Sequence, residues 1–206
     1  GQEVEIVLFK DPSKFLDQTI KEKPDVVGLS FYFWNTHLNH TVTKQIRKIL
    51  KDDVTIIWGG ASVDSFSPEI KRLFTRFPEV DAFIPEEGEL GFANLVGYLL
   101  ENKIQNLREP VDGVALMVDG ELIRGKSVGL SMDLSQLDSP YLEGILDPFL
   151  ETFYQPLLQT SRLCPYTCTF CTSGKNKGKL RAFTIEQVIE EINFISSNRS
   201  PFFVVK

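Results

Sequence analysis

Short apolar runs alternate with amphipathic stretches over the first half of the chain. Four of these runs are continuous and apolar, which is typical of strands buried on both faces. They occupy residues 5–9, 26–33, 55–58 and 81–84. Between them, apolar residues recur at helical spacing, as at Ile70, Leu73 and Phe74. The alternation predicts a doubly wound, Rossmann-like α/β domain over residues 1–108, with helices covering both faces of a parallel sheet.

Capping residues indicate where two of the helices begin. Asp11 precedes Pro12, and these are favoured types for the N-cap and the first helical position, so we expect a helix from there to about Glu22. Further along, Thr184 and Gln187 have the spacing of a capping box before a second amphipathic stretch.

The alternation ends near Glu109. Apolar runs at 113–118 and 121–123 are separated by Asp-Gly, which predicts a hairpin closed by a type I′ turn. We assign residues 109–150 to this hairpin and a linker. A second unit is predicted over residues 151–206. Its apolar runs, which predict strands on either side of the Thr184 helix, are residues 157–160 and 202–205.

The composition excludes several classes of protein. Of the 206 residues, 42% are apolar and 24% are charged, as in a folded domain rather than a disordered or fibrous chain. A net charge of −6 without a long basic block argues against nucleic acid or an anionic membrane as the main partner. No apolar run approaches the roughly 18 residues of a membrane-spanning helix. We see no signal peptide and expect a soluble, cytoplasmic protein.

Three cysteines lie within eight residues, at Cys164, Cys168 and Cys171. An odd number in so short a segment argues against a disulfide framework. Three thiolates at this spacing can ligate three irons of a 4Fe–4S cluster and leave the fourth iron open. A structural zinc site is less favoured, because it takes four ligands and no fourth stands nearby. A group of inert buried thiols is a third reading.

Small and acidic residues lie late in one predicted strand and directly after two others, where an open parallel sheet binds its ligands. They are Ser30, Gly59, Gly60, Ala61, Ser62, Glu87, Gly88 and Glu89. The glycines allow a bulky ligand to approach the backbone, although they could equally serve only tight turns. Neither Gly-x-Gly-x-x-Gly nor a Walker phosphate loop is present, which disfavours ordinary dinucleotide or nucleoside triphosphate binding.

Two tryptophans and two histidines near these strand ends give weaker evidence of a binding site. Trp34 and Trp58 end predicted strands, so we expect them in the core or in a pocket wall. His37 and His40 are the only histidines, and on a polar helix start they are more often solvated than ligands.

Two groups of motifs resemble a known superfamily. Thr160-Ser-Arg-Leu-Cys-Pro-Tyr-Thr-Cys-Thr-Phe-Cys171 resembles the signature of radical S-adenosylmethionine enzymes, including the aromatic Phe170 before the third cysteine. Upstream, Asp25-Val-Val-Gly-Leu-Ser30, Gly59-Gly60 and Glu87-Gly88-Glu89 resemble the subclass with an N-terminal cobalamin-binding domain. Hairpin, linker and cysteine segment follow in that subclass's order, so the resemblance spans essentially the whole chain.

The resemblance implies a set of cofactors. Cys164, Cys168 and Cys171 would ligate a 4Fe–4S cluster whose open iron binds the amino and carboxylate groups of S-adenosylmethionine. One electron, from an external donor such as flavodoxin or ferredoxin, would cleave that molecule to methionine and a 5′-deoxyadenosyl radical. Phe170 would lie near the adenine. Residues 151–206 would form the first βαβ unit of an incomplete (β/α) barrel.

The resemblance also implies that cobalamin lies across the carboxyl edge of the first sheet. The residues beside it would be Ser30, Tyr32, Gly59, Gly60, Ser62, Gly88 and Glu89. In that subclass a methyl–cobalt species often donates its methyl group to a substrate radical. The implied reaction is therefore methyl transfer to an unactivated centre of a small-molecule substrate that the sequence does not identify.

Two departures from the family pattern lead to expectations of their own. Many cobalamin-binding domains carry Asp-x-His-x-x-Gly after the first strand, whereas this chain has Lys10-Asp-Pro-Ser-Lys14, so we expect cobalt without a histidine from that motif. A barrel needs on the order of 200 residues. The family's Gly-Gly-Glu segment is also missing. We therefore expect that the chain is a fragment and cannot catalyse the reaction alone. We also expect that its strand at 202–205 lacks a neighbour within the chain and pairs between molecules.

Two alternatives stay open at this point. The first is a radical S-adenosylmethionine enzyme whose N-terminal domain no longer binds cobalamin. The second is a non-enzymatic binding module in which the cysteines hold zinc.

Overall fold

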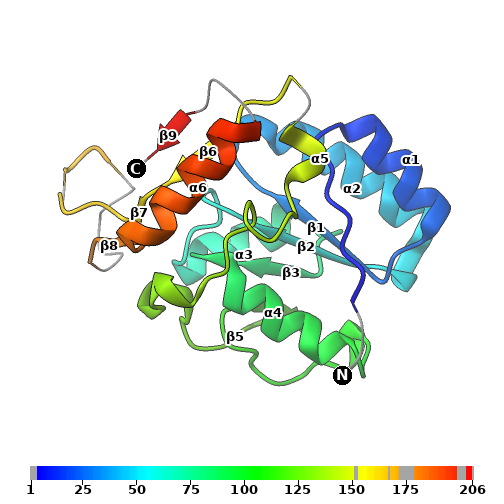
Figure 1. Ribbon diagram of the computed structural model, residues 1–206. Coiled ribbons are helices and arrows are strands. Elements are labelled where there is room, and N and C mark those ends of the chain that lie inside the picture. The colour runs from blue at the N-terminus through cyan, green and yellow to red at the C-terminus, as the bar shows by residue number, and fades with distance from the viewer. Residues whose placement is uncertain (1–3, 151–152, 167, 172–178, 199–202, 206) are drawn as a thin grey trace. The chain divides into compact units, whose positions relative to one another are not determined.

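The computed structural model describes residues 4–150, 153–166, 168–171, 179–198 and 203–205. The chain forms two compact units, Gly1–Gly129 and Leu130–Lys206, and each is described by itself (Figure 1). Among the helices of the described ranges, none combines the length and the apolar character needed to cross a membrane.

The first unit is built on a five-stranded mixed sheet. Its strands lie in the order β1 (Val26–Ser30), β2 (Thr55–Gly59), β3 (Ala82–Ile84), β4 (Ala115–Val118) and β5 (Glu121–Arg124) (Figure 1). The first three are parallel, as predicted, whereas β4 runs antiparallel to β3 and β5 antiparallel to β4. The predicted hairpin is therefore present but extends the sheet. Its turn has positive φ at both central residues, 50° and 83°, as a type I′ turn requires.

Four helices follow the sequence signals closely. They are α1 (Pro12–Glu22), α2 (Thr36–Leu50), α3 (Ser67–Arg76) and α4 (Gly88–Leu99). The Asp11 carboxylate accepts hydrogen bonds from the backbone N–H groups of Ser13 and Lys14, which confirms the predicted cap. Short 3-10 turns η1 (Phe33–Asn35), η2 (Lys51–Asp53) and η3 (Ile104–Asn106) adjoin other elements.

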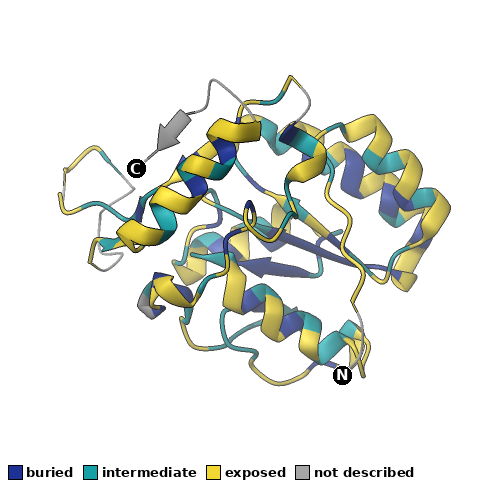
Figure 2. Ribbon diagram, in the orientation of Figure 1, coloured by how far each residue is buried: buried dark blue, intermediate teal, exposed yellow. Residues whose placement is uncertain are grey.

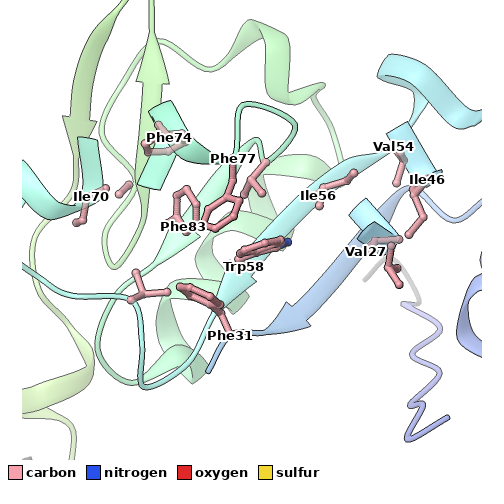
Figure 3. Close-up of a cluster of buried hydrophobic side chains, with 14 of the residues drawn as sticks. Val27, Phe31, Ile46, Val54, Ile56, Trp58, Ile70, Phe74, Phe77 and Phe83 are labelled. Carbon is pink, nitrogen blue, oxygen red and sulfur yellow. The ribbon is translucent and has the colours of Figure 1, made fainter. Parts of the chain in front are cut away.

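Hydrophobic clusters cover both faces of this sheet, as the sequence predicted. On one face, Trp58 and Phe83 of the sheet pack with residues of α2 and α3 (Figure 3). On the other, Ile57 and Ala82 pack with Leu95 of α4. The two central strands, β2 and β3, are accordingly almost entirely buried (Figure 2). Trp58 is fully buried, and its indole N–H donates to the hydroxyl of Thr43 at 3.1 Å, so its polar atom is satisfied.

The predicted strand at 5–9 is wrong. This segment forms neither strand nor helix, and Ile6 and Val7 are 70% and 52% exposed. The next prediction, 26–33, is too long, because β1 ends at Ser30 and the chain turns into η1. An apolar run indicates a preference for extended structure, but it does not supply the neighbouring strand that the structure needs. Within the described residues β1 pairs only with β2, and it forms the edge of the sheet.

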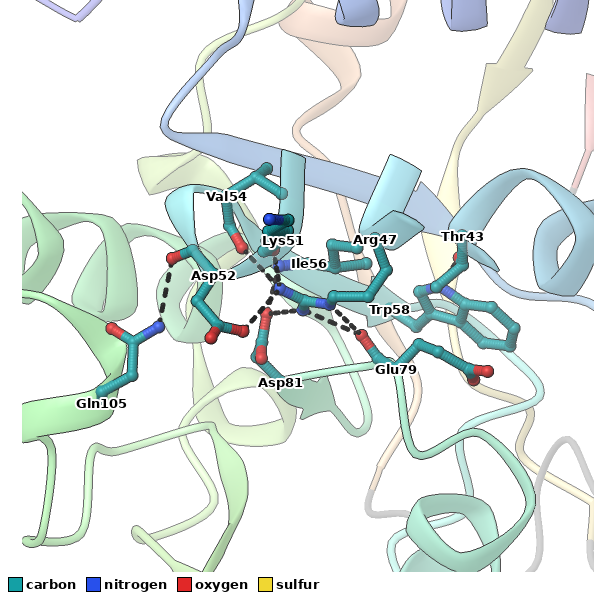
Figure 4. Close-up of polar contacts among 10 residues, drawn as sticks. All are labelled: Thr43, Arg47, Lys51, Asp52, Val54, Ile56, Trp58, Glu79, Asp81 and Gln105. Atoms are coloured by element: carbon teal, nitrogen blue, oxygen red, sulfur yellow. Dashed lines mark hydrogen bonds and ion pairs between the residues drawn. The ribbon is translucent and has the colours of Figure 1, made fainter. Parts of the chain in front are cut away.

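Arg47, near the end of α2, joins the amino ends of β2 and β3 (Figure 4). Its guanidinium donates to the carbonyls of Glu79, Lys51 and Val54, at 2.9, 2.6 and 3.1 Å. It also pairs with the carboxylate of Asp81 at 2.5 Å, and that carboxylate accepts from the N–H of Ile56 at 2.7 Å. Burial raises the pKa of Asp81, while the bonds from Ile56 and Arg47 oppose the rise.

The second unit contains a parallel βαβ arrangement. Strand β6 (Leu157–Gln159) pairs with β9 (Phe203–Val205), and α6 (Ile185–Asn198) connects them. The expectation that the last strand lacks a neighbour is therefore wrong, because β6 supplies one within the chain. A second ladder, β7 (Ser161–Arg162) with β8 (Arg181–Ala182), is antiparallel. The remaining helical segments are η4 (Gly129–Ser131), η5 (Leu134–Gln136) and α5 (Asp147–Leu150).

A small core fixes β6 within this unit. Tyr141, Leu158 and Ile195 are buried together. The Tyr141 hydroxyl donates to the carbonyl of Leu157 at 2.9 Å and accepts from its N–H at 3.0 Å. Burial raises the pKa of Tyr141, so it keeps its proton at neutral pH.

The predicted capping box of α6 is only half present. The N–H of Gln187 donates to the hydroxyl of Thr184 at 3.2 Å, as a capping box requires. The side-chain amide of Gln187 instead donates to the carbonyl of Leu137.

Replacing Arg47 with methionine tests the connection at the amino ends of the strands. Arg47→Met leaves Asp81 and three carbonyls without their cationic partner, so we expect the free energy of unfolding to fall by about 3 kcal/mol. The matched control is Lys48→Met at the next, exposed position, which should change it by less than about 0.5 kcal/mol. Urea unfolding measures both, and equal effects would contradict the prediction.

Candidate cofactor site

The carboxyl ends of the three parallel strands lie side by side. In the sheet register Ser30 is opposite Gly59, and Gly59 is opposite Ile84. The predicted ligand-binding residues lie at these ends or in the loops that follow. The structure thus brings together Ser30, Tyr32, Gly59, Gly60, Ser62, Gly88 and Glu89 at one edge of the first unit. Their binding roles stay predictions.

The loops after β1 and β2 are joined by backbone hydrogen bonds. The N–H of Phe31 donates to the carbonyl of Gly59 at 2.6 Å, and the N–H of Ser62 donates to the carbonyl of Phe31 at 3.2 Å. Gly60 has φ +118°, and a Cβ there would lie 3.0 Å from the Phe31 oxygen. The fold itself therefore requires a glycine at Gly60, whatever binds there.

The loop after β3 is supported by the segment that follows β5. Glu86 has φ +69°, unusual for a residue other than glycine, and its carboxylate accepts a hydrogen bond from the hydroxyl of Ser127. A Cβ on Gly129 would lie 2.7 Å from the carbonyl oxygen of Glu87. These contacts fix the path of the loop to Gly88, where α4 begins.

Two asparagines hold the aromatic turn after β1. Asn35 accepts a hydrogen bond from the N–H of Tyr32 at 2.9 Å and donates to the carbonyl of Ser30 at 2.8 Å. Asn39, which is buried, donates to the same carbonyl at 3.0 Å. Neither residue was among the predicted site residues. Their signal in the sequence was two side-chain amides, four residues apart, shortly after a predicted strand.

Trp34 is not a core residue. The core was one of the two environments expected for it, and a pocket wall was the other. It is 68% exposed, whereas Trp58 is fully buried. The Trp34 ring stacks on Tyr32 with centroids 4.6 Å apart and planes 8° apart, and Phe33 meets it edge-on at 4.9 Å. The carboxyl edge therefore presents an ordered group of aromatic rings to solvent.

The two histidines differ in environment. His37 is exposed on the first turn of α2, as expected. His40 is half-buried, and its Nε2 lies 3.5 Å from a carboxylate oxygen of Glu79. In the parts of the chain that the structure describes, no three side chains of His, Cys, Asp or Glu come close enough to hold a metal ion.

The three cysteines lie in the second unit and form no disulfide. Cys164 and Cys171 are half-buried and Cys168 is exposed. The N–H of Cys171 donates to the carbonyl of Cys168 at 3.1 Å, but the sulfur atoms are not gathered into a metal-binding group. Phe170 is 91% exposed, and residues 167 and 172–178 lie outside the described ranges. Ligation by these cysteines and contact of Phe170 with adenine both stay predictions.

A short ladder brackets the cysteine segment. In the pairing of β7 with β8, Arg162 lies opposite Arg181. Arg181 also donates to the carbonyl of Met132 at 2.8 Å. Residues 152–185 contain five basic residues and no acidic one, in a chain whose net charge is −6. The cysteines therefore lie in a locally cationic part of an acidic protein.

A pocket of about 340 Å³ lies elsewhere in the first unit. It is lined by residues around the start of β3 and by η3, including Asp81 and Gln105, and none of the predicted site residues lines it.

Comparison with known proteins relates the chain to a class of enzymes. No family model matches it. It is 30% identical over 182 residues to the 2-(S-pantetheinyl)-carbapenam-3-carboxylate methyltransferase of Streptantibioticus cattleyicolor. The same identity and length relate it to the cobalamin-dependent radical SAM methyltransferase TokK of Streptomyces tokunonensis. These matches cover 85% and 84% of this chain but 26% of each relative.

The fold is similar to part of a solved enzyme. The chain matches the cobalamin-dependent S-adenosylmethionine radical enzyme OxsB, solved with aqua-cobalamin and S-adenosylmethionine bound, with a TM-score of 0.68. Identity is 24%, and the match covers 90% of this chain and 25% of that one. Over most of its length, this chain is a homologue of cobalamin-dependent radical S-adenosylmethionine enzymes, and it spans about a quarter of the relatives that it matches.

Proposed function

We propose that this chain is a part of a cobalamin-dependent radical S-adenosylmethionine methyltransferase. In this proposal the first unit binds cobalamin and Cys164, Cys168 and Cys171 hold a 4Fe–4S cluster. The observation that carries it is the alignment of three strand ends, at Ser30, Gly59 and Ile84, in a chain homologous to TokK. The substrate would be a small molecule.

The carboxyl edge fits a large flat cofactor. At the ends of β1 and β2 it carries Ser30 and Gly59, whose side chains are too small to cover the strand ends. The loop after β3 reaches α4 through Gly88, so backbone N–H groups of a helix start face the same edge. In parallel sheets this edge is where ligands bind. A corrinoid would therefore meet backbone and small side chains at three adjacent strands.

The thiol groups of the cysteine segment are chemically suited to ligate an iron–sulfur cluster. None of the three cysteines forms a disulfide, and each is half-buried or exposed. Thiolate is the ligand that iron–sulfur clusters take. The five basic residues in the same stretch of sequence would offset the negative charge of a thiolate-ligated cluster. A structural zinc site takes four ligands, and residues 152–185 contain no His, Asp or Glu to add to the three cysteines.

Each residue of the site would have a holding or orienting role. When bound, the cluster supplies an electron for cleavage of S-adenosylmethionine, and the cobalamin supplies a carrier for the methyl group. The cysteines would hold the cluster, and Phe170 would contact the adenine with its exposed ring. Ser30, Gly59 and Gly60 would leave room for the nucleotide tail of cobalamin.

An external protein would deliver the electron. Flavodoxin or ferredoxin is the class of donor that we propose, since the positive charge of residues 152–185 would attract an acidic carrier to the cysteine segment.

Retention of cobalamin tests the first half of the proposal. After incubation with hydroxocobalamin and removal of unbound ligand, the chain should keep the corrin absorbance. Ser30→Phe should lose it, because a large ring would fill the end of β1, whereas the matched control Thr75→Phe, on the exposed last turn of α3, should keep it. No absorbance with the unchanged chain would favour a first unit that no longer binds cobalamin.

Anaerobic reconstitution with iron and sulfide tests the second half. The chain should gain a sulfide-dependent visible absorbance that Cys168→Ala abolishes and the neighbouring control Thr169→Ala preserves. The thermal unfolding of the first unit should be unchanged in Cys168→Ala, since the two units have separate cores. Stoichiometric zinc without that absorbance would favour the non-enzymatic module.

A further inference from the structure

The pocket of about 340 Å³ in the first unit takes no part in the proposed function. Its lining comes from the end of α3, the start of β3, η3 and β4. It therefore lies toward the amino ends of the parallel strands, whereas the predicted cofactor residues lie at their carboxyl ends. Its volume is within the range of small-molecule sites, which is about 300 to 1,000 Å³.

Most of the lining is apolar, and four of its side chains are buried: Phe74, Val80, Leu107 and Leu116. These residues belong to the two hydrophobic clusters of the sheet, so packing fixes their positions. Placing a hydrocarbon group against such a surface releases water and is favourable. The pocket is therefore suited to the apolar part of a small ligand.

Two polar side chains at the pocket, those of Asp81 and Gln105, offer hydrogen-bond acceptors. One carboxylate oxygen of Asp81 accepts bonds from Arg47 and Ile56, and within the described ranges the other oxygen accepts none. The side chain of Asp81 is 23% exposed, so a ligand can approach it. Gln105 donates its amide N–H to the carbonyl of Asp52, which leaves the amide oxygen for another donor (Figure 4). Together the two acceptors suit a group with several N–H donors.

Arg108 contributes a positive charge to the same pocket. Its Nη1 donates to the carbonyls of Gln105 and Leu107, at 2.8 and 3.2 Å, so the guanidinium is held beside η3. A guanidinium has several N–H donors, and these two bonds use only one of its nitrogens. The other N–H groups are available to a carboxylate of a ligand, with which arginine forms strong, charge-assisted bonds.

We infer that this pocket binds a small α-amino acid with an apolar side chain. The carboxylate of the ligand would pair with Arg108, and its ammonium group would donate to the free oxygens of Asp81 and Gln105. Its hydrocarbon side chain would lie on the buried apolar lining. The inference is independent of the proposed function, because neither cobalamin nor the cysteines take part in it.

The environment of Asp81 supports this assignment. Burial raises the pKa of its carboxyl group, while the bonds from Ile56 and Arg47 oppose the rise. A partly buried carboxylate interacts more strongly with an opposite charge than an exposed one does, because water screens it less. Acids with a perturbed pKa that line a pocket are typical of binding sites.

Three related ligands test the proposed chemistry on the 206-residue chain. Free leucine carries both charges, leucinol lacks the carboxylate, and N-acetylleucine lacks the ammonium group. In NMR titrations, leucine should bind with a dissociation constant below about 1 mM. Each of the other two should bind at least about tenfold more weakly, because a polar group of the pocket stays unpaired. Leucinol or N-acetylleucine binding as tightly as leucine would overturn the inference, as would the absence of binding by leucine, isoleucine and phenylalanine.

Replacing Arg108 tests the contact with the carboxylate. Arg108→Met removes the charge but keeps an unbranched side chain, so leucine should bind about tenfold more weakly. Leucinol has no carboxylate, so its affinity should change by less than about threefold. The matched control Lys103→Met removes an exposed cation just before η3 and should leave both affinities unchanged. Equal losses for leucine and leucinol, or no loss for leucine, would contradict the assignment.

Filling the pocket tests where the ligand lies. Val118 lines the pocket at the end of β4. In Val118→Trp the larger ring should occupy that space, so leucine should no longer bind, and thermal unfolding shows whether the variant is folded. Leucine binding that persists in the folded variant would overturn the inference. If the variant does not fold, the comparison of Arg108→Met with Lys103→Met still decides.

The outcomes also separate this inference from the proposed function. Val118→Trp should retain hydroxocobalamin to the same extent as the unchanged chain, because the substitution lies away from the carboxyl ends of β1 and β2. A chain that binds leucine as described but no cobalamin contradicts only the proposed function. A chain that retains cobalamin but binds none of the three amino acids contradicts only the inference.

Discussion

The contact between Arg47 and Asp81 is the constraint from which the geometry of the first unit follows. One guanidinium joins the end of α2 to the starts of β2 and β3, and the Asp81 carboxylate also binds the N–H of Ile56. With these starts tied together, the register fixes where the strands end, so that Ser30, Gly59 and Ile84 form one row. The charged network lies at the amino ends of the strands, so the carboxyl ends are free to carry loops.

Those loops are shaped by the backbone more than by side chains. Gly60 has no room for a Cβ against Phe31, and Gly129 has none against Glu87. Gly60, which the sequence marks as a ligand-binding candidate, thus has a structural role as well. Both roles are compatible, because a loop held close to the strand ends is also one that a large cofactor can approach.

Local signals predicted most of the first unit. The Asp11 cap, the Asp119-Gly120 turn and the buried runs of β2 and β3 depend on neighbours in sequence, and all are present. Predictions that needed a partner strand were less successful. Residues 5–9 have the composition of a strand but pair with none among the described residues, and β4 joins β3 by contacts that no local pattern encodes.

At the candidate site, too, local sequence signals were predictive and tertiary contacts were not. The sequence placed Ser30 and Gly59 correctly at one edge, since parallel strands align their carboxyl ends. It could not show that Trp34 faces solvent while Trp58 is buried, because both follow apolar runs and only tertiary packing distinguishes them. For the cysteines, spacing gives a candidate donor set, but the described residues form no group of three metal-binding side chains, so ligation by these cysteines stays a prediction.

The most direct test of the account is the position of cobalt in a crystal of the chain grown with hydroxocobalamin, located by anomalous scattering at the cobalt edge. A single strong peak is expected beyond the carboxyl ends of β1 and β2. A peak at any other part of the chain, or a crystal without cobalt, would contradict it.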